Sequence, residues 1–284
     1  MAQTDSNRIS FQGELGANSH IAARDAYPAL EPLPCPSFED AFAAVSEGHA
    51  KYAMIPVENS VAGRVADVHH LIPDSDLFIV AERFIPIRHQ LLGLPNATLE
   101  GLKRVRSHTQ ALGQCRKLLR ELGVEAVTAE DTAGAAREIK ALGDPSVGAL
   151  ASSLAAEIHG LKVLRADVAD AQHNTTRFLV FSRTEESAAH GSGPCMTSFV
   201  FRVRNVPAAL YKGLGGFATN GVNMTKLESY LEGGSFSAAM FYAEVEGHPQ
   251  DRGLGFAFDE LRFFSTLKVL GTYPADPFRR KGWD

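Results

Sequence analysis

A passage of small and polar residues, RTEESAAHGSGPC at 183–195, divides the chain into two regions with different hydrophobic patterns. Before it, short apolar runs of the β type alternate with helical patterns, which predicts an α/β region with a largely parallel sheet. A chain of 284 residues is long enough for two domains. The passage is therefore interpreted as an interdomain linker.

The first region shows clear signals for strands and helices. Its expected strands lie at 8–13, 52–58, 77–87, 124–129, 147–152 and 176–182. Ser37, with Asp40 three residues later, resembles a capping box at a helix start. A second helix is expected after SHT at 107–109, with Ser107 or Thr109 as cap, and a third at 132–142, capped by Asp131 or Thr132.

The region after the linker has a different order of elements. A strand at 197–204 precedes a helix opened by Pro207, and two strands at 222–231 and 235–246 are joined by a tight turn at 232–234. An amphipathic helix around 254–264 then leads to a last strand at 266–273. This β-α-β-β-α-β order predicts a ferredoxin-like fold.

Composition and motifs exclude several classes of function. A net charge of -5 argues against a nucleic-acid-binding protein, and no segment is apolar enough over a sufficient length to cross a membrane. The start, MAQTDSNRIS, lacks the apolar core of a signal peptide, so a cytoplasmic location is expected. The three cysteines, Cys35, Cys115 and Cys195, have no metal-ligand spacing, and Cys115 is expected to be a buried thiol.

Polar clusters fall at the ends of several expected strands, where α/β folds bind ligands. They are FQGELGANS at 11–19, PVENS at 56–60, SHTQ at 107–110 and AQHNTTRFLVF at 171–181. The first lacks the full GxGxxG spacing, and no Walker motif, Ser-His-Asp arrangement or HExxH is present. His69 and His70 are neighbours and are expected at the surface.

These clusters offer hydroxyls, amides, one histidine and one arginine. Such groups can hold an anionic small molecule and polarise a leaving group through hydrogen bonds. Each cluster also has a simpler interpretation. Asn59 or Ser60 could cap a helix, and Arg177 could form a surface ion pair beside threonines that favour strands.

The ordered set of motifs closely resembles the prephenate dehydratase family, joined to a C-terminal ACT domain. The matching segments are FQGELGANS, PVENSVAGRV at 56–65, SHTQALGQC at 107–115, GALASSLAAEIHGL at 148–161, NTTRF at 174–178 and GVNMTKLESYL at 221–231. The resemblance implies an α/β fold with a two-lobed catalytic region like a periplasmic binding protein, plus a ferredoxin-like ACT domain. It covers nearly the whole chain.

The resemblance implies the decarboxylative dehydration of prephenate to phenylpyruvate in phenylalanine biosynthesis, without a metal or cofactor. It implies that Thr176 provides a proton or a strong hydrogen bond to the departing hydroxyl, with Arg177 as its electrostatic partner. Arg177 would either bind a substrate carboxylate or order the loop. Asn59 and Ser60 complete the expected catalytic set. Further substrate contacts are expected at Ser19, Glu58, Ser107, His108, Ala151, Ser152, Asn174 and Phe178.

The implied domain boundaries are 8–182 for the catalytic region, 183–195 for the linker and 196–274 for the ACT domain. One lobe would hold roughly 8–82 with 176–182, and the other roughly 83–175. The site would lie between the lobes, whose closure would exclude water.

The ACT-like region implies phenylalanine as effector, bound at the interface of a homodimer or homotetramer. The matching positions are Gly213, Leu214, Asn223, Met224, Glu228 and Ser229. The family commonly has Arg-Pro after Glu-Ser, whereas this chain has Tyr230 and Leu231. That difference leaves the sign and strength of the response open.

Three alternatives remain at the level of sequence. Arogenate differs from prephenate only in an amino group in place of the keto group, and no residue named above separates the two substrates. A solute-binding protein with the same two-lobed fold and a catalytically silent amino-acid sensor are the others. A solute-binding protein is expected to carry a signal peptide, which this sequence does not show. A silent sensor would tolerate loss of the catalytic threonine, whereas Thr176 is present.

Overall fold

The computed structural model describes residues 6–171, 173–204, 206–231 and 238–282. The chain forms two compact units. The first comprises residues 1–69 and 83–178, and the second residues 70–82 and 179–284. Two strands, β5 (Phe78–Pro86) and β11 (Thr175–Ser182), continue from one unit into the other. The boundaries given above for the catalytic region, linker and ACT domain stay predictions.

The first sheet has the strand order β2-β1-β3-β11-β5, with β4 paired to β3. Strand β1 pairs in parallel with both β2 and β3. Its elements are β1 (Arg8–Gln12), α1 (Asn18–Ala26), β2 (Glu31–Cys35), α2 (Phe38–Ser46), β3 (Tyr52–Asn59), β4 (Gly63–Arg64) and α3 (Ala66–Asp74). The carboxyl ends of β1 and β3 therefore lie at one edge of this sheet.

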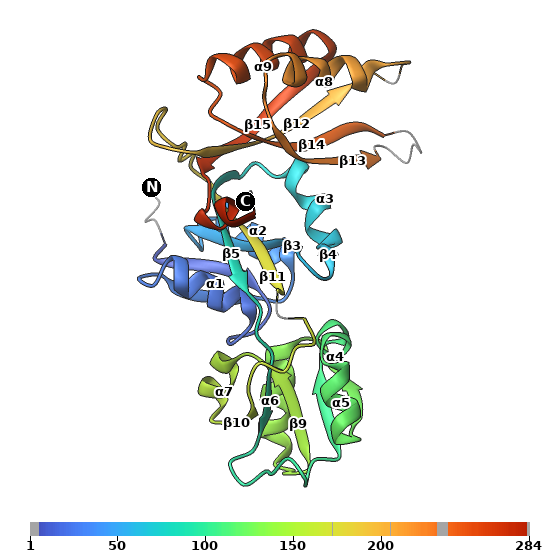
Figure 1. Ribbon diagram of the computed structural model, residues 1–284. Coiled ribbons are helices and arrows are strands. Elements are labelled where there is room, and N and C mark those ends of the chain that lie inside the picture. The colour runs from blue at the N-terminus through green and yellow to red at the C-terminus, as the bar shows by residue number, and fades with distance from the viewer. Residues whose placement is uncertain (1–5, 172, 205, 232–237, 283–284) are drawn as a thin grey trace. The chain divides into compact units, whose positions relative to one another are not determined.

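The second sheet has the order β10-β6-β9-β7-β8. Helices α4 to α7 connect its strands (Figure 1). The elements are β6 (Gln90–Gly93), β7 (Arg104–Ser107), α4 (Thr109–Gln114), α5 (Arg116–Leu122), β8 (Glu125–Thr128), α6 (Thr132–Leu142), β9 (Val147–Ala151), α7 (Ser153–His159) and β10 (Lys162–Arg165). Together the two sheets give the first unit two α/β lobes.

Local signals placed the starts of α2 and α6 correctly, whereas the helix expected to open at Pro207 begins at Ala209. Ser37 caps α2 by accepting from the backbone N–H of Asp40, and Asp131 caps α6. The expectation for the helix after SHT was wrong in two respects. His108 is the cap, and the helix breaks at Cys115 into α4 and α5, because the backbone of Cys115 leaves the helical region at φ -124° and ψ 29°.

The C-terminal sheet confirms the ferredoxin-like prediction. Its antiparallel order is β13-β14-β12-β15, and α8 and α9 cover one face (Figure 1). The elements are β12 (Cys195–Val203), α8 (Ala209–Thr219), β13 (Met224–Leu231), β14 (Ala238–Glu246), α9 (Arg252–Phe264) and β15 (Ser265–Pro274), followed by a 3-10 helix (Pro277–Gly282). The turn expected at 232–234 lies outside the described residues.

A phenylalanine-rich core fills the space between this sheet and its helices. Phe199 lies 5.0 Å from Phe258 and 5.7 Å from Phe217, in edge-on and stacked contacts respectively. Gly213 on α8 lies close to α9, since an added Cβ there would come within 3.2 Å of Leu261. A side chain at position 213 would therefore require the Leu261 side chain to shift.

The opposite face of the C-terminal sheet carries a buried polar network. Arg279 binds both carboxylate oxygens of Glu82 at 2.6 and 2.9 Å and lies 3.6 Å from a carboxylate oxygen of Glu244. Because Glu82 belongs to β5, the hydrogen bonds of Arg279 hold this strand against the C-terminal sheet. Gly271 of β15 lies so near the carbonyl of Ile79 that any side chain there would overlap it.

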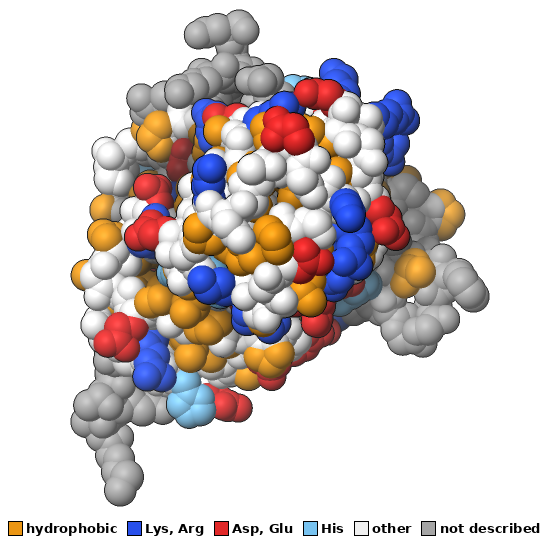
Figure 2. Space-filling model, turned by 90° about the horizontal axis from the view of Figure 1, so that it is seen from below, with side chains coloured by type: hydrophobic (Ala, Val, Ile, Leu, Met, Phe, Trp, Pro, Cys, Tyr) orange, Lys and Arg blue, Asp and Glu red, His pale blue; other side chains and the backbone are white. Residues whose placement is uncertain are grey.

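Within the described residues, no helix combines the length and apolarity needed to span a membrane. On the face of the molecule drawn in Figure 2, the described acidic and basic side chains are interspersed rather than separated by sign. The expectation that both His69 and His70 lie at the surface was wrong for His69. That side chain is buried, and its Nε2 lies 3.3 Å from the carbonyl of Val57.

Candidate active site

A cavity of about 570 Å³ lies within the first unit. Its walls come from both lobes: from the ends of β1 and β3, the start of α1, the segment 62–67, β11, α4 and the start of α6. Residues 87 and 89, where the chain passes from the first sheet to the second, also line it. The edge of strand ends predicted from sequence is thus the edge that forms the cavity.

Thr176, near the start of β11, is buried and its side chain lines this cavity. Its Oγ1 accepts a 2.9 Å hydrogen bond from Nδ2 of Asn59, at the end of β3. The Asn59 amide is oriented by the backbone N–H groups of Val61 and Ala62, which donate to its Oδ1 at 3.0 and 2.8 Å. Among the described residues the proton of Thr176 has no acceptor, so it can be donated to a ligand.

Gln114 and His89 line the cavity but were not assigned to the site from the sequence. Oε1 of Gln114, at the end of α4, lies 2.9 Å from Nε2 of His89 and 2.9 Å from Nδ2 of Asn174. Asn174 in turn accepts from Asn59 at 2.7 Å. The sequence signal for Gln114 was present in SHTQALGQC, but only the fold shows that α4 turns it toward the strand that carries Thr176.

Arg177 does not line the cavity. Successive residues on a strand point to opposite faces, and its side chain lies behind the sheet, with Nη1 3.2 Å from Oε2 of Glu58. The guanidinium also lies 5.9 Å from the ring of Phe84. With the Arg177 side chain only 5% exposed, this ion pair orders β3 and β11 around the cavity.

The other predicted substrate contacts divide into two groups. Ser19, His108 and Phe178 line the cavity, and Ser60 closes the loop beside it by donating to the carbonyl of His173 at 2.8 Å. The residues that the structure does not bring to the cavity are Glu58, Ser107, Ala151, Ser152 and Asn174. Ser107 donates instead to the carbonyl of Leu150 at 2.6 Å.

The FQGELGANS segment connects the two lobes. Glu14 forms two hydrogen bonds with Arg137 of α6, at 2.7 and 2.8 Å, and these bonds lower the pKa of Glu14. The carbonyl of Gly16 accepts from Ser152, which also caps α7. An added Cβ at Gly16 would lie 2.8 Å from the Cα of Ala155. Gly16 therefore serves a close contact between the lobes. Both glycines of the motif adopt positive φ values, 106° at Gly13 and 96° at Gly16.

The inner wall of the cavity is uncharged and the rim is charged. Burial lowers the pKa of His89, with an opposing contribution from its hydrogen bond to Gln114. Helix α1 begins at the cavity, and its N-cap residue Ala17 makes no side-chain cap bond, which leaves the positive end of the helix dipole facing the space. Arg64, Asp67 and Glu130 are exposed at the rim.

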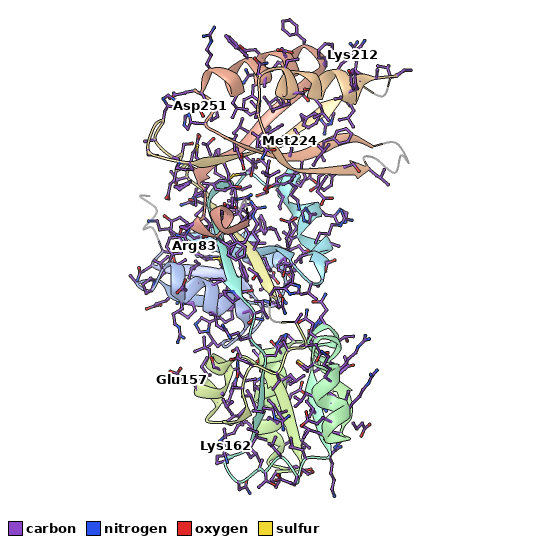
Figure 3. The ribbon with its side chains drawn as sticks, viewed as in Figure 1. Arg83, Glu157, Lys162, Lys212, Met224 and Asp251 are labelled. Atoms are coloured by element: carbon purple, nitrogen blue, oxygen red, sulfur yellow. The ribbon has the colours of Figure 1, made fainter. Side chains whose placement is uncertain are left out.

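The positions expected to bind an effector lie on both faces of the C-terminal sheet. Gly213 and Leu214 are on α8, and Met224 packs against the same core from β13 (Figure 3). Ser229 pairs with Phe241, whose side chain belongs to that core, whereas Glu228 pairs with Tyr242 on the other face. Asn223 is exposed just before β13. The structure therefore separates Glu228 from the helix-side positions.

Comparison with known proteins identifies the family. The family model for prephenate dehydratase matches residues 9–186. The chain belongs to the prephenate dehydratase family. Among the described residues of this family member, no group of three or more metal-ligating side chains is placed to hold a metal ion.

The relatives carry several activities in their names. The chain is 50% identical over 274 residues to a bifunctional N-acyl-homoserine lactone acylase/prephenate dehydratase of Komagataeibacter europaeus, covering 96% of this chain and 98% of that protein. It is 38% identical to arogenate dehydratase/prephenate dehydratase 1 of Arabidopsis thaliana, covering 96% and 73%. The structure of prephenate dehydratase from Arthrobacter aurescens in complex with L-Phe is 29% identical, with a TM-score of 0.87 and coverage of 94% and 90%.

Proposed function

We propose that this protein catalyses the decarboxylative dehydration of prephenate to phenylpyruvate, water and carbon dioxide. The observation that carries the proposal is the Thr176 hydroxyl, held as an acceptor by Asn59 in a cavity with an uncharged inner wall. Membership of the prephenate dehydratase family supports it independently.

The chemistry requires help for a poor leaving group. As the bond from the ring to its carboxylate breaks, the electron pair forms the aromatic ring and the ring hydroxyl departs. Departure as hydroxide is slow unless a proton or a strong hydrogen bond meets it in the transition state. Thr176 donates that hydrogen bond and passes its proton to the departing oxygen, which leaves as water. A proton from solvent then restores the hydroxyl of the side chain.

The hydrogen bond from Asn59 makes the Thr176 hydroxyl a better hydrogen-bond donor. Because Asn59 Nδ2 can only donate, it occupies a lone pair of Oγ1 and directs the Thr176 proton away from itself. Accepting one hydrogen bond also strengthens the bond that a hydroxyl donates. A neutral hydroxyl can therefore act here without a shifted pKa of its own.

Binding a dianion requires donors at the other side of the cavity. The start of α1 supplies backbone N–H groups and the positive end of the helix dipole, and the Ser19 hydroxyl lies beside them. Ile87, Ala111 and Phe178 provide an apolar wall for the ring. Arg177, by its ion pair with Glu58, holds the strand that carries Thr176.

Arogenate is the rival substrate of the same reaction. The name of the Arabidopsis relative joins both activities, which supports testing both. The acidic side chains Asp67, Glu130 and Asp131 at the cavity could attract an ammonium group. Comparing the two substrates at equal concentration distinguishes them.

We also infer phenylalanine regulation through an ACT domain in a homodimer or homotetramer, with domain boundaries as given from the sequence. The phenylalanine complex of the Arthrobacter relative supports the effector. Tyr230 is buried and Leu231 is exposed at the end of β13, in place of the arginine and proline common in the family.

A second candidate activity is hydrolysis of an N-acyl-homoserine lactone. The 50% identical relative, which is named for both activities, favours including it in the test. The two cavity histidines among the described residues are already engaged. His89 is bonded to Gln114, and His108 caps α4. Among the described residues, neither is hydrogen-bonded to Thr176, as the base of a catalytic triad would be.

The test is to incubate the purified protein separately with prephenate, arogenate and an N-acyl-homoserine lactone, and to identify the products by mass spectrometry. Phenylpyruvate from prephenate supports the proposal. Phenylalanine formed only from arogenate would change the substrate, and lactone hydrolysis without dehydration would replace the proposed reaction. Repeating the assay with added phenylalanine tests the regulation.

A further inference from the structure

Three carboxamides and one imidazole form a continuous chain of hydrogen bonds along the cavity. Asn59 Nδ2 lies 2.7 Å from Asn174 Oδ1, and Asn174 Nδ2 lies 2.9 Å from Gln114 Oε1. The chain ends at His89, whose Nε2 lies 2.9 Å from the same Gln114 oxygen. This chain joins the end of β3, the residue before β11, the end of α4 and the segment before β6.

The direction of every bond in this chain follows from its first member. Backbone N–H groups can only donate, so the atom of Asn59 that faces Val61 and Ala62 must be the oxygen. Its amide nitrogen then donates to Asn174, which must accept with its oxygen and donate with its nitrogen. The atom of Gln114 that meets Asn174 is therefore its oxygen.

His89 has a single role compatible with this direction. The Gln114 oxygen cannot donate, so Nε2 of His89 must carry the hydrogen. With its oxygen held by two donors, the amide nitrogen of Gln114 has no acceptor among the described residues, although Gln114 lines the cavity. Both N–H bonds of that nitrogen are available to a ligand.

We propose that His89 is a positioning residue: its Nε2–H holds the Gln114 carboxamide with the NH₂ group toward the cavity, where it donates to an oxygen of an anionic substrate. The identity of that substrate rests on the proposed function. The orientation of Gln114 rests on the hydrogen-bond chain alone.

Burial supports the neutral form that this role uses. The His89 side chain is 4% exposed, and desolvation lowers its pKa. Without the His89 donor, Gln114 would keep one bond, from Asn174, and could rotate its amide. A rotated Gln114 would present an oxygen to an anion, which repels it.

Two substitutions separate this role from simple packing. His89→Phe keeps an aromatic ring and removes the donor, whereas His89→Gln keeps an N–H group near the position of Nε2. We expect His89→Phe to raise KM for prephenate by roughly tenfold or more, the range of a hydrogen bond to a charged group, with a smaller change in kcat. His89→Gln should remain within about threefold of wild type, since its donor is retained.

A double-variant cycle tests whether His89 acts through Gln114. Gln114→Glu retains an oxygen for His89 and Asn174 but presents a second oxygen to the cavity. If His89 works by orienting Gln114, adding His89→Phe to Gln114→Glu should raise KM no further. Additive increases, or equal losses in His89→Phe and His89→Gln with lowered melting temperatures, would overturn the proposal.

An NMR measurement decides the tautomer without any assay of activity. In protein labelled with ¹⁵N-histidine, the His89 signals, identified by their loss in His89→Gln, should show a protonated Nε2 and an unprotonated Nδ1 near neutral pH. Protonation at Nδ1 instead would overturn the proposal even if the enzyme is active. Wild-type protein with the expected tautomer but no turnover would refute the proposed function and leave the His89–Gln114 orientation in place.

Discussion

Asn59→Asp replaces the amide NH₂ group by a carboxylate oxygen. Residue 59 would then accept a hydrogen bond from Thr176 instead of donating one. The new carboxylate can still accept from the backbone N–H groups of Val61 and Ala62. Its second oxygen would lie where Nδ2 now stands, 2.9 Å from Thr176 Oγ1 and 2.7 Å from Asn174 Oδ1. The Thr176 proton would then be donated to that carboxylate instead of to the leaving hydroxyl.

The magnitude follows from the loss of one transition-state donor. Removing a positioned donor of this kind lowers kcat by roughly 10²- to 10³-fold. The fold should persist, because the Asn174 amide can rotate to face the new oxygen, although it then releases Gln114. We therefore expect a large fall in kcat with a shift of only a few degrees in melting temperature, a small effect for a chain of this size.

The assay is steady-state formation of phenylpyruvate from prephenate, together with circular dichroism and thermal unfolding. Thr175→Val is the matched control, because the Thr175 side chain is not used in the network and its substitution should leave kcat unchanged. An Asn59→Asp variant that folds and retains wild-type kcat would show that the orientation of Thr176 does not depend on Asn59.

Three further predictions concern stability and titration. Arg279→Met removes two hydrogen bonds from the buried Glu82 carboxylate and should lower the free energy of unfolding by about 3 kcal/mol, measured by urea denaturation. The double variant Arg279→Met with Glu82→Met should recover part of this loss. Burial raises the pKa of Cys115 to about 12, so iodoacetamide near pH 8 should label this thiol only after unfolding, and rapid labelling of folded protein would contradict that. Because burial lowers the pKa of His89, the unfolded chain binds a proton that the folded chain does not as pH falls below about 6.5. Wild type should therefore lose up to about 1.4 kcal/mol of unfolding free energy per pH unit in that range relative to His89→Gln, and parallel pH profiles would refute this.

The strands and helices with strong local signals could be predicted from the sequence. The alternating pattern at 197–204 and the capping residues Ser37 and Asp131 are local features, and the structure confirms each. Strand β2, with two prolines in EPLPC, gave no such signal. It is held by parallel pairing to β1, which is a long-range interaction.

The candidate site was predictable only in part, for the same physical reason. Thr176 and Asn59 lie in motifs, but their 2.9 Å contact joins positions 117 residues apart. The direction of a side chain also depends on the phase of its strand. That phase directs Thr176 to the cavity and Arg177 to Glu58. The sequence resemblance placed Thr176 at the departing hydroxyl but left open whether Arg177 binds the substrate or orders the loop.

His89 could not be assigned to the site from the sequence. Its sequence context, RHQLLG, carries no recognised motif, and its importance lies entirely in the bond to Gln114 on another element. The two glycines of FQGELGANS show the opposite case. They were conspicuous in the sequence, and the fold assigns Gly16 to a close contact with α7.

The role of Thr176 is tested most directly by measuring the phenylpyruvate and carbon dioxide that wild type, Thr176→Val and Thr176→Ser form from prephenate. We expect equal amounts of the two products from wild type, and a loss of roughly 10²-fold or more in kcat for Thr176→Val with an unchanged fold. Thr176→Ser, which keeps a hydroxyl, should retain partial activity. Wild-type turnover by Thr176→Val would contradict the central claim that this hydroxyl meets the departing group.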